Sequence, residues 1–235
     1  DSISKPKTRF ALCAVTPSEW MNKQAKSSSW SDHLVKTIHN PVPSSYFKNR
    51  DQEACKRALG ISSERPLVLC IAGNLEEERK GGNILKEVLN SELEDVSFLL
   101  IGRTTNSVMN HKENIYSLGF IQDELTMQIA YHAADLVLHP APIDNLPNTV
   151  AEAMSAGTPI LSFQTGGLPE MVVPGKSGWL VPEINAQLMA QELHSIIKSK
   201  SYNNLRNSTK ELAEKLFAPK EIEKQYKELI QGLVS

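Results

Sequence analysis

The sequence of 235 residues has little of what would assign it at once to a class of protein. Lys and Arg number 25 against 27 Asp and Glu, and the formal net charge of −2 gives no basic field for binding nucleic acid. No run of about 18 apolar residues is present, and the opening DSISKPKTRF has no apolar centre of a signal peptide. These absences exclude a membrane-spanning helix, make nucleic acid a poor candidate partner and favour a cytoplasmic protein.

Cysteine is also scarce. The three cysteines, Cys13, Cys55 and Cys70, are widely spaced and odd in number, so they give no disulfide framework. Two of them sit in apolar, strand-like runs, where a buried free thiol is common. We expect structural thiols in a reducing compartment.

Motifs of several common enzyme classes are missing. The segment IAGNLEEERKGG has the wrong spacing for the Gly-x-Gly-x-x-Gly turn of dinucleotide-binding oxidoreductases, and no Gly-x-Ser-x-Gly elbow of serine hydrolases occurs. His139, at the end of a predicted strand, is interpreted as a satisfied structural histidine. We expect no metal site and no cofactor, because none of the histidines lies at metal-ligand spacing from another ligand; they are His33, His39, His111, His132, His139 and His194.

The sequence does contain a regular alternation of short apolar runs with helical patterns. The runs are continuously apolar, which suits a parallel sheet covered on both faces; they span 66–73, 96–102, 115–121, 134–140, 158–163 and 177–182. Helices are expected at 82–91, 123–133, 147–156, 185–200, 201–216 and 219–233. The alternation predicts an α/β fold with a doubly wound, Rossmann-like parallel sheet, which binds ligands at the carboxyl ends of its strands.

The chain is expected to have three parts. Residues 1–47 are interpreted as the tail of an amino-terminal domain, with one strand, a helix and a second strand, followed by a proline-rich interdomain linker. Residues 48–216 form the Rossmann-like domain, and 217–235 form a carboxyl-terminal helix. Pro219 suits the first turn of that helix, where a missing N–H costs little.

The densest cluster of unusual residues lies between Ala141 and Val172. A polar loop containing Asp144 precedes a helix that starts near Pro147, with Asn145 or Asn148 as its capping candidate. The amides and dipole of such a helix start attract an anion, and a phosphate is the expected occupant.

Glu152, eight residues after Asp144, can lean back from the helix towards the loop. Two acids at this spacing are by themselves a weak signal, because a solvated helix face explains most such pairs. However, the neighbours of Glu152 are small and apolar, which indicates a packed environment where a carboxylate needs partners.

The stretch DNLPNTVAEAMSAGTPILSFQTGGLPEMVVPGKSGWLV closely resembles the carboxyl-terminal motif of the retaining glycosyltransferases of family 4, which have the GT-B fold. The second acid of that motif is Glu152, and its Gly-Gly pair is Gly166-Gly167. Asp144 stands where the family usually has Glu. The resemblance implies that Glu152 binds the ribose hydroxyls of a nucleotide and that Asp144 lies near the donor sugar.

The resemblance extends to the rest of the chain. Lys80-Gly81 matches the segment whose lysine neutralises the donor diphosphate, while Asn74 replaces the usual arginine, so that Arg79 substitutes for it or the site has one cation fewer. From the residues alone, a solvated charge run, EEERK, is the favoured interpretation of Arg79 and Lys80, and the resemblance reverses it for Lys80 only. The Gly102-Arg103 step and the Leu-Gly-Phe segment resemble the base pocket, although the glycines could simply end strands. The expected donor-binding residues are Glu152, Arg79, Asn74, Gly73, Gly102, Arg103, Phe120, Ile121, Asn145, Leu146, Pro147, Asn148 and Thr149.

The resemblance implies transfer of a hexose from a UDP- or GDP-sugar to an acceptor, with retention of configuration, as in polysaccharide biosynthesis. Asp144 and Lys80 are the expected catalytic residues, Lys80 at the leaving diphosphate. The bulk of the amino-terminal GT-B domain is missing, so this chain alone is expected to bind the donor without completing transfer. Any peripheral contact with a membrane is expected through the missing domain. The alternatives are a non-catalytic nucleotide-sugar-binding module and, less favoured, another Rossmann-type nucleotide-binding enzyme.

Overall fold

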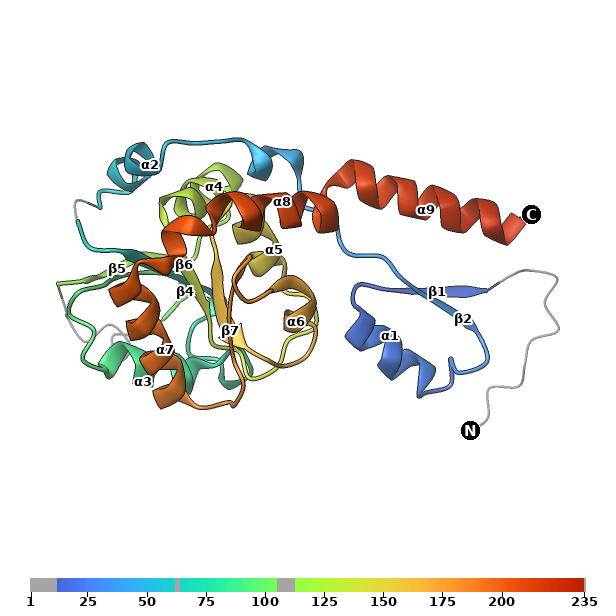
Figure 1. Cartoon of the computed structure of the whole chain (residues 1–235), viewed down its shortest axis with the longest axis horizontal. Coiled ribbons are helices and arrows are strands. Elements are labelled where there is room, and N and C mark those ends of the chain that lie inside the picture. The colour runs from blue at the N-terminus through green and yellow to red at the C-terminus, as the bar shows by residue number, and fades with distance from the viewer. Residues whose placement is uncertain (1–11, 62–63, 105–112, 235) are drawn as a thin grey trace.

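The computed structural model describes residues 12–61, 64–104 and 113–234 and is dominated by one parallel sheet (Figure 1). Its six strands run in the order β5-β4-β3-β6-β7-β8, all pairs parallel. Their bounds are β3 Leu67–Asn74, β4 Ser97–Arg103, β5 Ile115–Gly119, β6 Leu136–His139, β7 Ile160–Phe163 and β8 Gly178–Val181. Each predicted apolar run forms one strand, and the doubly wound α/β prediction is confirmed.

The strand order reverses direction between β3 and β6, which are paired through Val68 and Leu136. In a doubly wound sheet this reversal opens a crevice beyond the carboxyl ends of the two central strands. The loops that follow β3 and β6 therefore meet at the position where such folds bind ligands.

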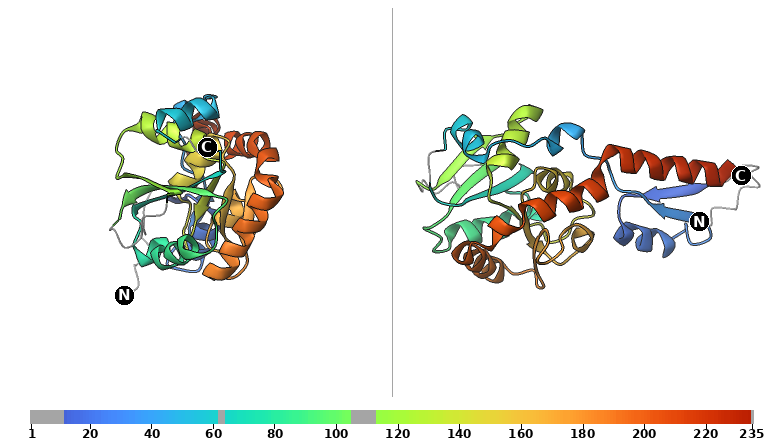
Figure 2. Two further views of the ribbon diagram at one scale, coloured as in Figure 1. Left: turned by 90° about the vertical axis from the view of Figure 1, so that its left-hand side faces the viewer. Right: turned by 45° about the horizontal axis from the view of Figure 1, so that its top comes forward.

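Helices cover both faces of the sheet, and each face has its own apolar core (Figures 1 and 2). One face is covered by α3 Gly82–Asn90 and α7 Ala186–Ser199. The other carries α2 Gln52–Ala58, α4 Glu124–Ala133, α5 Asn148–Ser155 and α8 Arg206–Phe217. Because both faces are buried, strands such as β4, with six of its seven residues buried, contain a continuous apolar run rather than an alternating pattern.

Three details depart from the predicted helices. Neither α2 nor α6, Leu168–Met171, is among them. Asp51 is the N-cap of α2, because its side chain accepts a hydrogen bond from the amide of Ala54. This capping residue is the local sequence signal for the short helix. The predicted helix at 201–216 begins instead with a 3-10 turn, Ser201–Asn204, because Lys200 adopts a left-handed φ of 52° that interrupts helical geometry.

A smaller unit lies beside the six-stranded unit (Figure 1). It consists of β1 Cys13–Thr16, α1 Glu19–Lys26 and β2 Leu34–Thr37, with β1 and β2 paired in parallel. The chain then passes through a 3-10 turn, η1 Ser44–Phe47, into the larger unit, and α9 Pro219–Val234 runs back over the smaller one (Figures 1 and 2). The amide of Val42 donates to the carbonyl of Phe217 at 2.9 Å, which ties the two connections together.

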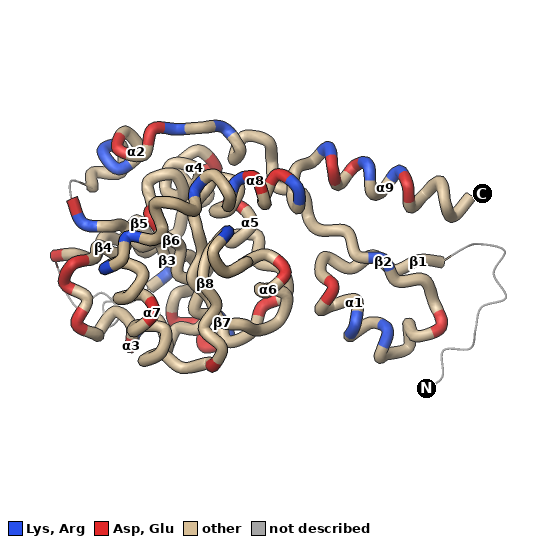
Figure 3. Tube along the Cα trace, viewed as in Figure 1, with Lys and Arg blue, Asp and Glu red and all other residues tan. Residues whose placement is uncertain are grey.

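Charged residues of both signs are interspersed along the helices, as α9 illustrates in Figure 3. None of the helices in the described residues combines the length and apolar character needed to cross a bilayer. The three cysteines are free thiols, and Cys55 and Cys70 are buried. Burial raises the pKa of the Cys70 thiol, which keeps it in the neutral form suited to a core.

Candidate active site

The loops after β3 and β6 bring Lys80 and Asp144 together at the point where the strand order reverses. Lys80 ends a 3-10 turn, η2 Glu78–Lys80, and its Nζ lies 2.8 Å from Asp144 Oδ2. Their side chains are 26% and 14% exposed, so the pair is sheltered but remains open to a ligand. The two residues expected to be catalytic are thus direct partners, although they lie far apart in the sequence.

Close backbone packing fixes both loops. A Cβ on Gly81 would lie 2.1 Å from the carbonyl oxygen of Pro140, so only glycine lets the Lys80 loop rest against the end of β6. A Cβ on Gly166 would lie 1.9 Å from the carbonyl oxygen of Asp144, whose backbone also accepts the amide of Gly167 at 3.0 Å. The Gly-Gly pair singled out in the sequence therefore acts as the support beneath the Asp144 loop.

His139, at the end of β6, is the second basic side chain beside Asp144. It is buried, as expected for a structural histidine, and its Nε2 lies 3.5 Å from Asp144 Oδ2. The expectation that it is fully satisfied is wrong, because Nε2 has no hydrogen-bond partner among the described residues. Burial raises the pKa of Asp144, but His139 and Lys80 outweigh this effect and hold the pKa well below its usual range. Asp144 is therefore a carboxylate at neutral pH.

The helix α5 begins four residues after Asp144. Its N-cap is Pro147, with no side-chain cap, so the prediction that Asn145 or Asn148 caps it is wrong. The side chain of Asn145 instead accepts a hydrogen bond from the Ser18 hydroxyl, in the smaller unit. Without a side-chain cap, the amides of Asn148 and Thr149 are left for an anion, while Pro147 has no N–H to offer.

Glu152, on α5, has its own polar partner in α4. Its Oε2 accepts the Tyr131 hydroxyl of α4 at 2.8 Å, which supplies the partner that a packed carboxylate was expected to need. Burial raises the pKa of Glu152, and the hydrogen bond from Tyr131 partly offsets this. Tyr46, in η1, lies against Tyr131 with ring centroids 6.0 Å apart. The surroundings of Glu152 therefore include η1 as well as α4 and α5.

The remaining cation candidate, Arg79, points elsewhere. Its Nε pairs with Glu77 Oε1 at 3.0 Å, and the two side chains are 64% and 41% exposed. Arg79 thus forms an exposed charge pair, as the charge run EEERK indicates. Asn74, at the end of β3, accepts the amide of Glu76 at 3.0 Å, and Gly73 beside it is exposed with open space where a side chain would be. Lys80 is thus the candidate cation that approaches Asp144.

The residues expected to line the base site are Gly102, which the strand packing requires, and Arg103 and Phe120, which stack on each other at the surface. Gly102 has a φ of 145°, and a Cβ there would lie 1.9 Å from the carbonyl oxygen of Ala72, so the strand packing itself requires glycine. Arg103 places its guanidinium 5.0 Å from the centre of the Phe120 ring, which is 48% exposed. Ile121 packs partly buried against the core. Arg103 and Phe120 are therefore the members of this group that offer side chains to a ligand.

Within the described ranges, no group of three His, Cys, Asp or Glu side chains is arranged to hold a metal ion. His111, one of the six histidines, lies outside the described residues. Leu146, a donor-binding candidate, is buried in the core, so its side chain anchors the loop rather than facing a ligand.

Sequence reasoning missed Tyr131, Ser18 and Glu170. Tyr131 is fully buried in α4, and its hydroxyl could have been suspected because a buried tyrosine usually needs a polar partner. The contacts of Ser18 and Glu170 cross between the two units, and no local pattern indicates them.

The fold defines a class: a doubly wound α/β domain of the kind that forms one half of a GT-B protein, with Lys80 and Asp144 paired where the strand order reverses. The family described as Glycosyl transferases group 1 matches residues 66–199, which is more than half of the chain. The chain belongs to this family.

Relatives and solved structures agree with this assignment. Glycogen synthase of Chlamydia pneumoniae is 29% identical over 150 residues, covering 59% of this chain and 31% of the relative. D-inositol 3-phosphate glycosyltransferase of Mycobacterium marinum is 24% identical over 177 residues, covering 70% of this chain and 37% of the relative. The chain thus spans about a third of the length of these relatives.

Two solved structures share the fold over nearly the whole chain. Sucrose-phosphate synthase from Thermosynechococcus elongatus has a TM-score of 0.80 at 21% identity, covering 94% of this chain and 58% of the other. Anabaena Alr3699/HepE in complex with UDP also has a TM-score of 0.80, at 22% identity, covering 96% and 65%. The match includes the smaller unit, so the relation of the fold to GT-B proteins extends beyond the six-stranded sheet.

Proposed function

We propose that the protein binds a nucleotide diphosphate sugar in the crevice beyond β3 and β6 and transfers its hexosyl group to an acceptor with retention of configuration. The observation that carries the proposal is the Lys80–Asp144 pair, whose Nζ and Oδ2 atoms lie 2.8 Å apart. Asp144 lies four residues before the start of α5, a helix without a side-chain N-cap. A cation and free helix amides at one place are suited to a diphosphate.

The proposed roles follow from the chemistry of the leaving group. As the bond between the sugar and the diphosphate breaks, negative charge grows on the phosphate oxygens, where Lys80 and the amides of Asn148 and Thr149 stabilise it. Asp144, held ionised by its basic neighbours, accepts hydrogen bonds from sugar hydroxyls. Neither carboxylate is assigned as a nucleophile, and we propose attack from the face on which the leaving group departs, without a covalent intermediate.

Recognition of the nucleoside is assigned to Glu152 and to the exposed Arg103–Phe120 stack. Glu152, oriented by Tyr131, offers a free oxygen to the ribose hydroxyls, and Arg103 with Phe120 lines the base site. The Anabaena structures, in complex with UDP and with UDP-glucose, make UDP-sugars the first donors to test. The acceptor site is assigned to the amino-terminal domain of which β1, α1 and β2 form part, and the enzyme is proposed to be cytoplasmic.

A thermal-shift panel of UDP-, GDP- and ADP-sugars tests donor binding. A true donor at 100 times its dissociation constant stabilises the protein by about 2.7 kcal/mol. The Glu152→Ala variant, run in the same panel, is expected to lose most of that shift. A panel in which no nucleotide sugar changes the melting temperature contradicts the proposal, and a donor-hydrolysis assay distinguishes an enzyme from a non-catalytic binding module.

A further inference from the structure

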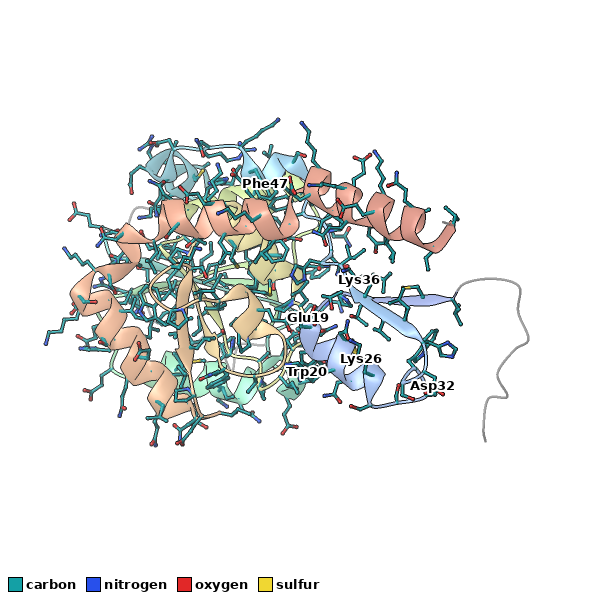
Figure 4. The ribbon with its side chains drawn as sticks, turned by 45° about the vertical axis from the view of Figure 1, so that its right-hand side comes forward. Glu19, Trp20, Lys26, Asp32, Lys36 and Phe47 are labelled. Atoms are coloured by element: carbon teal, nitrogen blue, oxygen red, sulfur yellow. The ribbon has the colours of Figure 1, made fainter. Side chains whose placement is uncertain are left out.

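The first turn of α1, in the smaller unit, is held by a side chain from the larger unit. Glu170 lies on α6, and its two carboxylate oxygens accept the amides of Glu19 and Trp20, each at 2.7 Å. Figure 4 shows Glu19 and Trp20 at the end of α1 that faces the larger unit, whereas Lys26 lies at the opposite end. The contact therefore lies directly between the two units.

This arrangement completes the N-terminal cap of α1. Ser18 is the local N-cap and accepts the amide of Met21 at 3.0 Å, which leaves the amides of the first two helical residues without a local acceptor. The Glu170 carboxylate satisfies both, and its negative charge faces the positive end of the helix dipole. Charge-assisted hydrogen bonds of this kind are stronger than neutral ones.

The same end of α1 also contacts the Asp144 loop. The Ser18 hydroxyl donates to Asn145 Oδ1, and a Cβ on Gly167 would lie 3.2 Å from Ser18 Cβ. The amide of Gly167 in turn donates to the Asp144 carbonyl. The start of α1, the Gly-Gly support and the Asp144 loop are thus one contact network, and Gly167 of this network lies three positions before Glu170 in the sequence.

We propose that Glu170 is a positioning residue for the transfer reaction: it anchors α1, and with it the acceptor-bearing domain, in a fixed orientation against the Asp144 loop. The inference rests on the proposed function, because it assigns the acceptor side to the unit that carries α1. Glu170 contacts neither the Lys80–Asp144 pair nor Glu152, so removal of its carboxylate is expected to change turnover more than nucleotide affinity.

Amide hydrogen exchange tests the anchor without any ligand. In the Glu170→Ala variant, the Glu19 and Trp20 amides are expected to exchange about tenfold faster or more, as lost hydrogen bonds raise the open population. Glu170→Gln keeps one acceptor oxygen and is expected to lie between the alanine variant and wild type. The control is Glu87→Ala, which removes an exposed carboxylate from α3, for which the described residues offer no partner. Unchanged exchange at Glu19 and Trp20 overturns the anchor.

Kinetics of UDP-glucose hydrolysis and calorimetry with UDP test the consequence. Glu170→Ala is expected to lower kcat by roughly tenfold, while the affinity for UDP stays within about twofold. Partial recovery of kcat in Glu170→Gln is the result expected of a positioning role. Equal losses of UDP affinity and kcat overturn it, because they make Glu170 part of the nucleotide pocket. If the wild type binds neither UDP nor GDP, the proposed function fails, and the exchange result alone decides whether the anchor exists.

Discussion

Removing the Lys80 ammonium is the sharpest perturbation of the proposed diphosphate site. In the Lys80→Ala variant, affinity for a nucleoside diphosphate is expected to fall while affinity for the free nucleoside is retained. A hydrogen bond between charged groups contributes about 1.5–3 kcal/mol, so the loss corresponds to roughly 10- to 150-fold in dissociation constant. The nucleoside is unaffected because its proposed contacts lie at Glu152 and at the Arg103–Phe120 stack.

The neighbouring carboxylate adds to this effect. At the observed 2.8 Å, Lys80 and Asp144 attract each other by about 6 kcal/mol before desolvation, for an effective dielectric constant of 20. Without Lys80, the Asp144 charge is left facing the incoming phosphates and repels them. Changing Asp144 to Asn in the Lys80→Ala background is therefore expected to recover part of the lost affinity.

Calorimetric titration with UDP and GDP, and competition with uridine and guanosine, measure these differences. Arg79→Ala is the matched control, because this neighbouring cation is exposed and paired with Glu77. Its affinity is expected to stay within about twofold of wild type. Equal losses for nucleoside and diphosphate in Lys80→Ala would falsify the phosphate role, and an Arg79 variant as weak as the Lys80 variant would show that general charge, not position, matters.

Further predictions concern the two carboxylates and their supports. Glu152→Ala is expected to weaken nucleotide binding more than Asp144→Ala; equal calorimetric affinities of wild type and the Glu152 variant would contradict the ribose assignment. Tyr131→Phe leaves a buried carboxylate oxygen without its donor and is expected to lower the free energy of unfolding by about 1–2 kcal/mol in urea. Gly167→Ala puts a Cβ 1.8 Å from the Asn145 carbonyl oxygen and is expected to lower the free energy of unfolding by about 1–3 kcal/mol. If the variant is as stable as wild type, the loop can move to accommodate the Cβ. The lowered pKa of Asp144 stabilises the fold above about pH 4, and this contribution is lost as pH falls through the folded-state value; the stability difference between wild type and Asp144→Asn should therefore shrink in acid.

The sheet could be predicted because its strands are buried on both faces. Continuous apolar runs such as 66–73 and 96–102 are typical of strands in a parallel sheet that is covered on both faces. The short helix α2 escaped prediction because its buried charged residue, Lys56, finds its partner only in the fold, where its Nζ lies 3.3 Å from Asp135 Oδ2. Local pattern specifies such a helix weakly, and tertiary contacts decide it.

The candidate site divides in the same way. The Lys80 and Asp144 positions could be read from motifs, since each lies in a loop directly after a strand. Their direct pairing, the failure of Asn145 as a cap and the partners of Glu152 could not, because each depends on residues more than 20 positions away. Arg79 and Lys80 are adjacent in sequence with opposite surroundings, and only the turn geometry of η2 distinguishes them.

The chain joins the two units twice, once on leaving β2 and once on entering α9, and the Val42–Phe217 hydrogen bond sets these crossings side by side. Two adjacent connections of this kind act as a hinge. They leave rotation about one line as the easiest relative movement and resist sliding or twisting. In a variant without the Glu170 contacts, relative movement of the two units is therefore expected to follow rotation about that line.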